Sequence, residues 1–143
     1  MKRYLAVLVS VAALIQAGVS SAGDDVLSSQ LQNVVAANIA ATSKDSESIT
    51  DFMNTIHSGS PAYVQIKTQM EQLMPAFDME TSLVEFSFIG VDGGYAIARV
   101  KQKLKKVSGP LFQDNVSEQM FIFHQELGEW KIWQVAMLNV ESL

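Results

Sequence analysis

Few side chains in this sequence are of the types that carry out acid–base, nucleophilic or metal chemistry. The 143 residues include two histidines, His57 and His124, and no cysteine. Without cysteine there are no disulfides, thiolate metal ligands or cysteine nucleophiles. The histidines lie far apart and form no His-Glu-x-x-His pattern, so we expect no metal and no cofactor. His57 is interpreted as a residue at the end of a helix, and His124 as a residue on the outer face of a sheet.

Two carboxylates are the candidates for a catalytic base. An apolar site raises the pKa of a carboxylate toward the working pH and makes it a usable base. Asp78 follows a predicted helix and could lie at the mouth of a pocket, which makes it the one catalytic candidate, although a turn residue at a helix exit is the favoured interpretation. Glu85 is predicted on the outer side of its strand, in an ion pair with Arg99.

A second set of side chains could hold a ligand rather than transform it. Gln102 and Gln119 fall in phase with the apolar side of their predicted strands, and a buried amide must find a hydrogen-bond partner. That partner is either another group of the protein or a ligand. The candidate ligand-binding residues share a predicted inward position: Tyr63, Phe86, Gln102, Gln119, Phe121 and Trp133. The aromatic members also fit a plain core.

Apolar spacing predicts three helices that would position these residues. The first covers Asp25–Thr42, and the second begins after Ser48, which with Asp51 forms a capping pattern. The third begins at Ser60, as N-cap, and ends or kinks at Pro75. After Asp78 the apolar period becomes two, which predicts four strands: Leu83–Val91, Tyr95–Val107, Val116–Leu127 and Trp130–Val140.

The alternation also assigns the two faces of the predicted sheet. The inner face, which should pack under the helices, carries Val84, Phe86, Phe88, Ala96, Ala98, Val100, Phe121, Phe123, Trp133, Val135 and Met137. The outer face mixes charged residues with Ile89, Ile97, Met120, Ile122, Ile132 and Leu138. Because the outer face is too apolar for full exposure, we predict a homodimer through the sheet. The fold class is therefore α+β, with N-terminal helices packed on a four-stranded antiparallel sheet.

The N-terminal segment resembles a signal peptide. Residues 1–22 contain a basic start, an apolar run from Leu5 to Val19, and small residues before a cleavage site after Ala22. This pattern predicts a single mature domain, 23–143, that is periplasmic or secreted in a bacterium and has no membrane span after cleavage. A net charge of −5 argues against nucleic acid as a partner.

The chain resembles the NTF2-like superfamily (SnoaL-like or cystatin-like cone). The resemblance covers about residues 25–143 and is carried by the order of the elements, by Asp92–Gln102 (DGGYAIARVKQ) and by Gly128–Ile132 (GEWKI). The stretches Ser60–Ala62 and Ser108–Asn115 resemble an exported bacterial subgroup without an assigned activity. The resemblance implies a strongly bent sheet wrapped around helices, a pocket at the wide end of the cone, and dimerisation through the sheet.

Two functional hypotheses follow from these observations. The first is a non-catalytic module that binds a small apolar molecule or a partner protein, because no acid, base or nucleophile is placed with certainty. The second is a small enzyme of the cyclase or isomerase kind, which would need Asp78 or another carboxylate inside an apolar pocket. A carboxylate lining the cavity would favour catalysis, whereas a cavity lined only by neutral side chains would favour binding.

Overall fold

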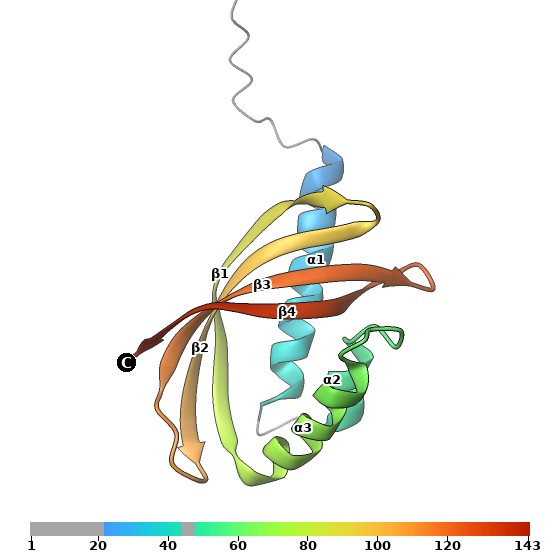
Figure 1. The fold of residues 1–143 in the computed structure, drawn as a ribbon. Coiled ribbons are helices and arrows are strands. Elements are labelled where there is room, and N and C mark those ends of the chain that lie inside the picture. Colours follow the sequence, from blue (N-terminus) through green and yellow to red (C-terminus); the bar gives the residue numbers. More distant parts are fainter. Residues whose placement is uncertain (1–21, 44–47) are drawn as a thin grey trace, which may run out of the picture.

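The part of the chain that the structure describes folds as three helices followed by a four-stranded antiparallel sheet, as predicted. The computed structural model describes residues 22–43 and 48–143; the predicted signal sequence therefore lies almost wholly outside the described residues. The elements are α1 (Ala22–Ala41), α2 (Ile49–Asn54), α3 (Tyr63–Ala76), β1 (Asp78–Asp92), β2 (Tyr95–Ser108), β3 (Asn115–Glu126) and β4 (Glu129–Ser142). The strands follow the order β1-β2-β3-β4, and the sheet curls around α1 while α2 and α3 lie at one end (Figure 1).

The start of α2 confirms the predicted cap, but the start of α3 does not. The side chain of Ser48 accepts a hydrogen bond from the backbone N–H of Asp51, which satisfies one of the unpaired donors of the first turn. The predicted N-cap Ser60 lies two residues before Ala62, the actual N-cap of α3. Ser60 instead donates its hydroxyl to the carbonyl of Trp133, 2.5 Å away, and accepts from the N–H of Ala62. Ser60 therefore fastens the loop before α3 to the sheet.

Bulges in the edge strands correct part of the predicted face assignment. The pairing of β1 with β2 shifts at Val84, and the pairing of β4 with β3 shifts at Trp133. Each extra residue reverses the alternation that follows it. Val84 is therefore half exposed instead of lying in the core, and Ile132, predicted on the outer face, is fully buried. The same shift pairs Glu85 with Lys101 rather than Arg99, and Arg99 pairs with Glu118.

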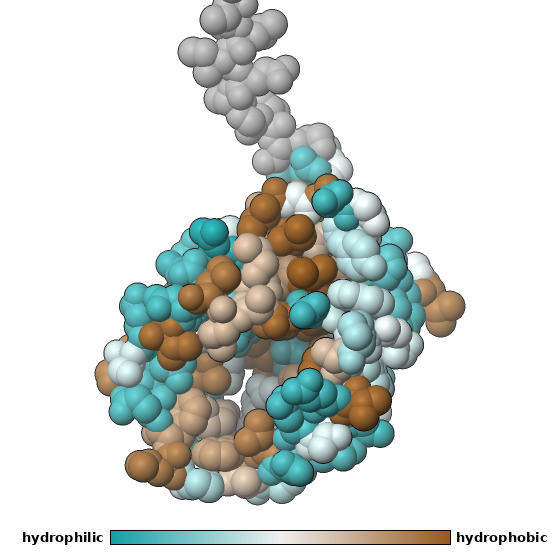
Figure 2. Space-filling view, in the orientation of Figure 1, coloured by the Kyte–Doolittle hydropathy of each residue, from teal (hydrophilic) through white to brown (hydrophobic). Residues whose placement is uncertain are grey.

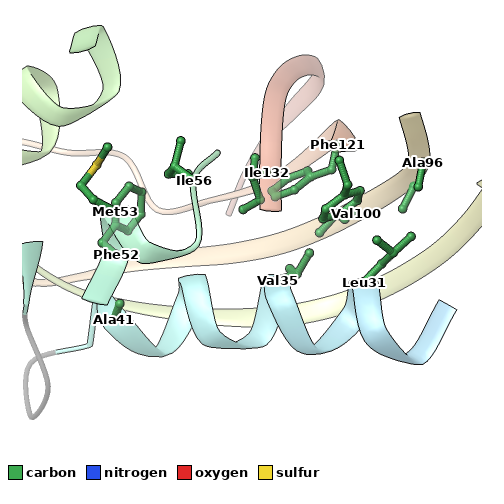
Figure 3. Packing of buried hydrophobic residues seen from close by; sticks show 12 residues of the cluster. Leu31, Val35, Ala41, Phe52, Met53, Ile56, Ala96, Val100, Phe121 and Ile132 are labelled. Atoms are coloured by element: carbon green, nitrogen blue, oxygen red, sulfur yellow. The ribbon is translucent and has the colours of Figure 1, made fainter. Parts of the chain in front are cut away.

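The core lies between α1 and the concave face of the sheet, which we define by Ala96, Ala98, Val100, Phe121 and Phe123. Leu31 and Val35, one helical turn apart on α1, are both fully inaccessible and pack against these residues (Figure 3). The small side chains of Ala96 and Ala98 are both fully inaccessible, and α1 makes its closer contacts with the edge strands β1 and β4. Phe52, Met53 and Ile56 extend the core toward the end where α3 lies.

A short parallel bridge joins the segment after α2 to the outer edge of β4. Ile56 pairs with Ile132. The N–H of Ile132 donates to the carbonyl of Thr55 at 2.8 Å, and the N–H of His57 donates to the carbonyl of Ile132 at 2.9 Å. The bridge covers the beginning of an edge strand that would otherwise present unpaired backbone groups, and it carries the chain from the concave face to the convex face.

Candidate functional site

A cavity of about 330 Å³ lies between the helices and the sheet at the end of the molecule that carries α3. Its volume falls in the range of small-molecule sites, about 300–1,000 Å³. Figure 2 shows this face of the molecule hollowed at its centre, with apolar residues around the opening. The lining residues come from all three helices, two strands and three connecting segments: Asn38, Ile39, Thr42, Phe52, Met70, Leu73, Met74, Phe77, Met79, Thr81, Gln102, Leu104 and Phe112.

Helix α3 forms one wall of this cavity and is otherwise poorly packed. None of its residues, all of which the structure describes, is fully buried. The helix packs against α2 and makes few contacts with the sheet. Its apolar side chains Met70, Leu73 and Met74 line the cavity, although Met70 also packs against the core. A helix of this composition is normally held by burial of its apolar stripe, so the cavity occupies space that a core would fill.

The loop between β2 and β3 closes another side of the cavity. Phe112 contributes to the lining and makes an edge contact with Phe77, with ring centroids 6.2 Å apart. The loop is held at both ends. Lys106 donates its ammonium to the carbonyls of Gly109 and Pro110, and the carboxylate of Asp114 accepts from the backbone N–H of Lys106 at 2.8 Å. Phe112 therefore lies on a fixed loop.

The polar groups of the lining are all uncharged. Asn38 donates to the hydroxyl of Thr55 at 2.8 Å, and Thr42 donates to the carbonyl of Ile39 at 2.7 Å. Gln102 makes no side-chain hydrogen bond to any other residue that the structure describes, although it is only 7% exposed. Among the described residues, no Asp, Glu, Lys, Arg or His side chain lines the cavity. The described part of the lining is therefore suited to contact with an apolar molecule.

The structure separates the six predicted ligand-binding residues. Gln102 is the member of the set that lines the cavity. Phe86 and Phe121 belong to the core or pack against it, as does Tyr63 at the start of α3. Gln119 is half-buried farther along the concave face, opposite Met137. Trp133 was predicted on the inner face, and this was wrong because the bulge in β4 directs it to the convex face.

Asp78, the catalytic candidate, begins β1 and lies between two residues that line the cavity. Phe77 and Met79 both contribute to the lining, whereas Asp78 does not. Both carboxylate oxygens of Asp78 are buried. The carboxylate is thus close to the cavity wall without contributing to its surface.

The lining residues Met70, Leu73, Met74 and Phe112 were not singled out from the sequence as candidate site residues. The helical spacing of the three α3 residues predicted only that they are buried, and the position of Phe112 predicted only a connecting loop. Neither observation indicates a cavity beside these residues. The strands gave a better indication. Met79, Thr81 and Gln102 are in phase with the concave face, so an earlier start of β1 would have placed the first two on the same face as Gln102.

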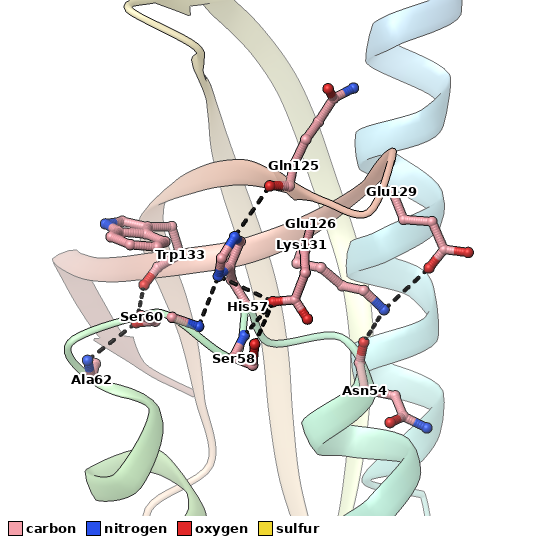
Figure 4. Close-up of polar contacts among 11 residues, drawn as sticks. Asn54, His57, Ser58, Ser60, Ala62, Gln125, Glu126, Glu129, Lys131 and Trp133 are labelled. Carbon is pink, nitrogen blue, oxygen red and sulfur yellow. Dashed lines mark hydrogen bonds and ion pairs between the residues drawn. The ribbon is translucent and has the colours of Figure 1, made fainter.

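A cluster of aromatic rings on the convex face holds the loop between α2 and α3. Tyr95 stacks on His124 with centroids 4.6 Å apart, and His124 stacks on His57 at 5.3 Å. Trp133 lies edge-on to both histidines. His57 is also fixed by the backbone, since its Nδ1 accepts from the N–H of Gly59 and its Nε2 donates to the carbonyl of Gln125 (Figure 4). These partners assign the histidines a structural role.

Glu126 links the same loop to the hairpin between β3 and β4. Its Oε2 accepts hydrogen bonds from the hydroxyl and the backbone N–H of Ser58, both at 2.7 Å. These two bonds, the hydroxyl first, hold the pKa of Glu126 below its ordinary value of 4.5, with a smaller contribution from the positive charge of Lys131. Lys131 in turn donates to the carbonyl of Asn54 and forms an ion pair with Glu129.

Two further properties concern metals and membranes. Within residues 22–43 and 48–143, no three His, Asp or Glu side chains are grouped so that they could bind a metal ion. No helix in this part of the chain combines the length and the apolar character needed to cross a bilayer.

Comparison with solved structures identifies the fold class. The chain is similar to a proposed dehydratase of the NTF2-like family from Streptomyces avermitilis, with a TM-score of 0.63 and 14% identity over 78% of this chain and 94% of that one. It is similar to a protein of unknown function with a cystatin-like fold from Nostoc punctiforme (TM-score 0.64, 11% identity, 85% and 93% covered). It is also similar to a proposed aromatic ring hydroxylase from Novosphingobium aromaticivorans (TM-score 0.65, 13% identity, 81% and 92% covered). The protein thus has the fold of these NTF2-like and cystatin-like structures.

Within this class, a more specific family is defined by sequence. Residues 33–143 match the C-terminal domain of the anti-sigma-I factor RsgI9, so the chain belongs to that family. None of the curated protein sequences matches the chain.

Proposed function

We propose that this protein is a non-catalytic binding module that holds a small, largely apolar molecule in the cavity under α3. The observation that carries the proposal is the lining, which combines methionine, phenylalanine and leucine side chains with a few uncharged polar groups. Methionine side chains adapt to irregular apolar shapes. A bound molecule would bury the apolar side of α3 and complete a core that the chain alone leaves open.

The position of Asp78 supports binding over the cyclase or isomerase alternative. A general base must come within hydrogen-bond reach of the proton that it removes, and Asp78 does not contribute to the cavity surface. The family adds indirect support, because an anti-sigma factor acts by binding a protein.

We further propose that the mature domain is exported and forms a homodimer through the convex face. Export rests on the pattern of residues 1–22. The dimer rests on the apolar residues of the convex face: Ile97, Met120 and Ile122, which are only partly buried within one chain.

Binding of a neutral fluorescent probe tests the main proposal. N-phenyl-1-naphthylamine should show saturable fluorescence enhancement with the purified domain. Leu104→Trp, which adds bulk inside the cavity, should weaken this binding at least tenfold. Val107→Trp is the matched control, because Val107 lies on the same strand, is 57% exposed and does not line the cavity. A probe that fails to bind, or that binds both variants equally, would refute the proposal.

Asp78→Asn provides a separate test of catalysis. Under the binding proposal the substitution leaves probe affinity unchanged. A substrate whose turnover by the native protein is abolished in the Asp78→Asn variant, with the melting temperature unaltered, would instead establish the enzyme hypothesis.

A further inference from the structure

The buried polar side chains of the molecule divide into two groups. The hydroxyls of Thr55 and Ser60 both donate and accept a hydrogen bond within the protein. Thr55 donates to the carbonyl of Phe52 and accepts from Asn38. Ser60 donates to the carbonyl of Trp133 and accepts from the N–H of Ala62. Gln102 and Ser117 have no such side-chain partners among the described residues. Buried polar groups are almost always hydrogen-bonded, so an exception calls for an explanation.

The two unpaired side chains are neighbours. Gln102 on β2 and Ser117 on β3 are direct cross-strand partners on the concave face, where facing Cβ atoms lie about 4.5–5.5 Å apart. They are 7% and 2% exposed. Gln102 lines the cavity. Thr81 of β1, whose hydroxyl also makes no hydrogen bond to a described residue, lines it too and pairs with Leu104, two residues along β2 from Gln102. The sheet side of the cavity therefore has a small polar spot within an apolar surface.

Every group in this polar spot is neutral. A glutamine amide offers two donors and two acceptor sites, and a hydroxyl offers both functions. Such groups can satisfy a hydroxyl or a carbonyl but cannot compensate a full charge, and burial of an unpaired charge is very costly.

We infer that the ligand of this cavity is an uncharged amphiphile, with an apolar body and one neutral hydrogen-bonding head, a hydroxyl or carbonyl group, that pairs with Gln102. This inference rests on the proposed function. The apolar body lies against Met70, Met74 and Phe112, and the head reaches the amide of Gln102, beside which the hydroxyl of Ser117 is buried. A carboxylate in place of the head is excluded by its charge.

A pair of ligands that differ in the head alone tests the inference. Decan-1-ol and decanoate have the same chain length, and at pH 8 decanoate is ionised. Each is used to displace N-phenyl-1-naphthylamine from the native protein. Decan-1-ol should compete with an affinity at least tenfold higher than that of decanoate. Equal competition by the two, or preference for decanoate, would overturn the inference while leaving the binding proposal intact, whereas a probe that never binds would remove the binding proposal itself.

Two substitutions then locate the head group. Gln102→Leu keeps the approximate volume and removes the amide, so decan-1-ol should bind about three- to tenfold more weakly, the usual effect of one neutral hydrogen bond. Gln119→Leu is the matched control, because Gln119 lies on the same concave face but does not line the cavity. An equal loss in both variants, or none in Gln102→Leu, would contradict the role of Gln102. The comparison of decan-1-ol with decanoate needs no variant and remains decisive if Gln102→Leu does not fold.

Discussion

Gly109 lies where the loop that carries Phe112 meets the junction of α3 and β1. Its φ of +124° is a backbone conformation that residues with a side chain rarely adopt. A Cβ at this position would lie 2.6 Å from the carbonyl oxygen of Ala76 and 3.2 Å from the Cα of Phe77. Because both contacts are with backbone, neither can be relieved by a side-chain rotation. We predict that Gly109→Ala destabilises the protein and loosens the wall of the cavity.

The size of the effect follows from two separate costs. The unfavourable backbone conformation costs about 1–3 kcal/mol, and the overlap with fixed atoms costs about 1–3 kcal/mol. With about 1.5 kcal/mol for each cost, near the lower end of both ranges, the predicted loss in the free energy of unfolding is about 3 kcal/mol. At a typical urea dependence of about 2 kcal/mol per molar, the unfolding midpoint falls by about 1.5 M.

Two other glycines separate these costs. Gly128 has a φ of +81° but open space around its Cβ position, so Gly128→Ala should lose only about 1 kcal/mol. Gly90 has neither a positive φ nor a neighbour within 4 Å, so Gly90→Ala should change stability by less than about 0.5 kcal/mol. Urea unfolding followed by circular dichroism measures all three variants. If Gly109→Ala loses no more stability than Gly128→Ala, the close approach of the loop to Ala76 is wrong.

Three further predictions concern acid stability, assembly and export. Hydrogen bonds from Ser58 lower the pKa of Glu126 in the folded state, so this carboxylate stabilises the fold above about pH 4.5, and its contribution is lost as the pH falls through the folded-state pKa. The difference in melting temperature between the native protein and Glu126→Gln should therefore shrink on acidification. A difference that stays constant with pH would contradict this prediction. Light scattering should give twice the monomer mass for the native domain and the monomer mass for Met120→Glu on the convex face, and a native monomer would disprove the dimer. Mass spectrometry of protein from its own host should show an N-terminus after Ala22, and an intact Met1 would rule out cleavage there.

The architecture could be predicted from the sequence because most helices and strands are indicated by local sequence patterns. The change of apolar period after Asp78 gave the strands, and the pair Ser48 and Asp51 gave the start of α2. The start of α3 could not be predicted in the same way. The hydroxyl of Ser60 donates a hydrogen bond to the carbonyl of Trp133, a residue distant in sequence, instead of capping the helix. The sequence around Ser60 contains no indication of this tertiary hydrogen bond.

The site could be predicted only in part, for two physical reasons. A bulge adds one residue to a strand and cannot be recognised from the amino-acid composition of that strand. The bulge in β4 nevertheless places Trp133 on the opposite face and Ile132 in the core. A cavity is a property of the distance between layers, so the apolar stripe of α3 is the same whether it contacts protein or empty space. Gln102 was identified because its phase along β2 is undisturbed. Ser117 has the same phase along β3 and was missed because a lone serine is common on any strand.

The bridge between Ile56 and Ile132 has a consequence for how the molecule opens. The amides of His57 and Ile132 donate to each other's segments, so neither can be exposed to solvent while the other stays protected. Local unfolding of the helix end would release the strand edge, and their hydrogen exchange should proceed at a common rate. Two stretches that are distant along the chain would thus behave as one unit in the opening of the native state.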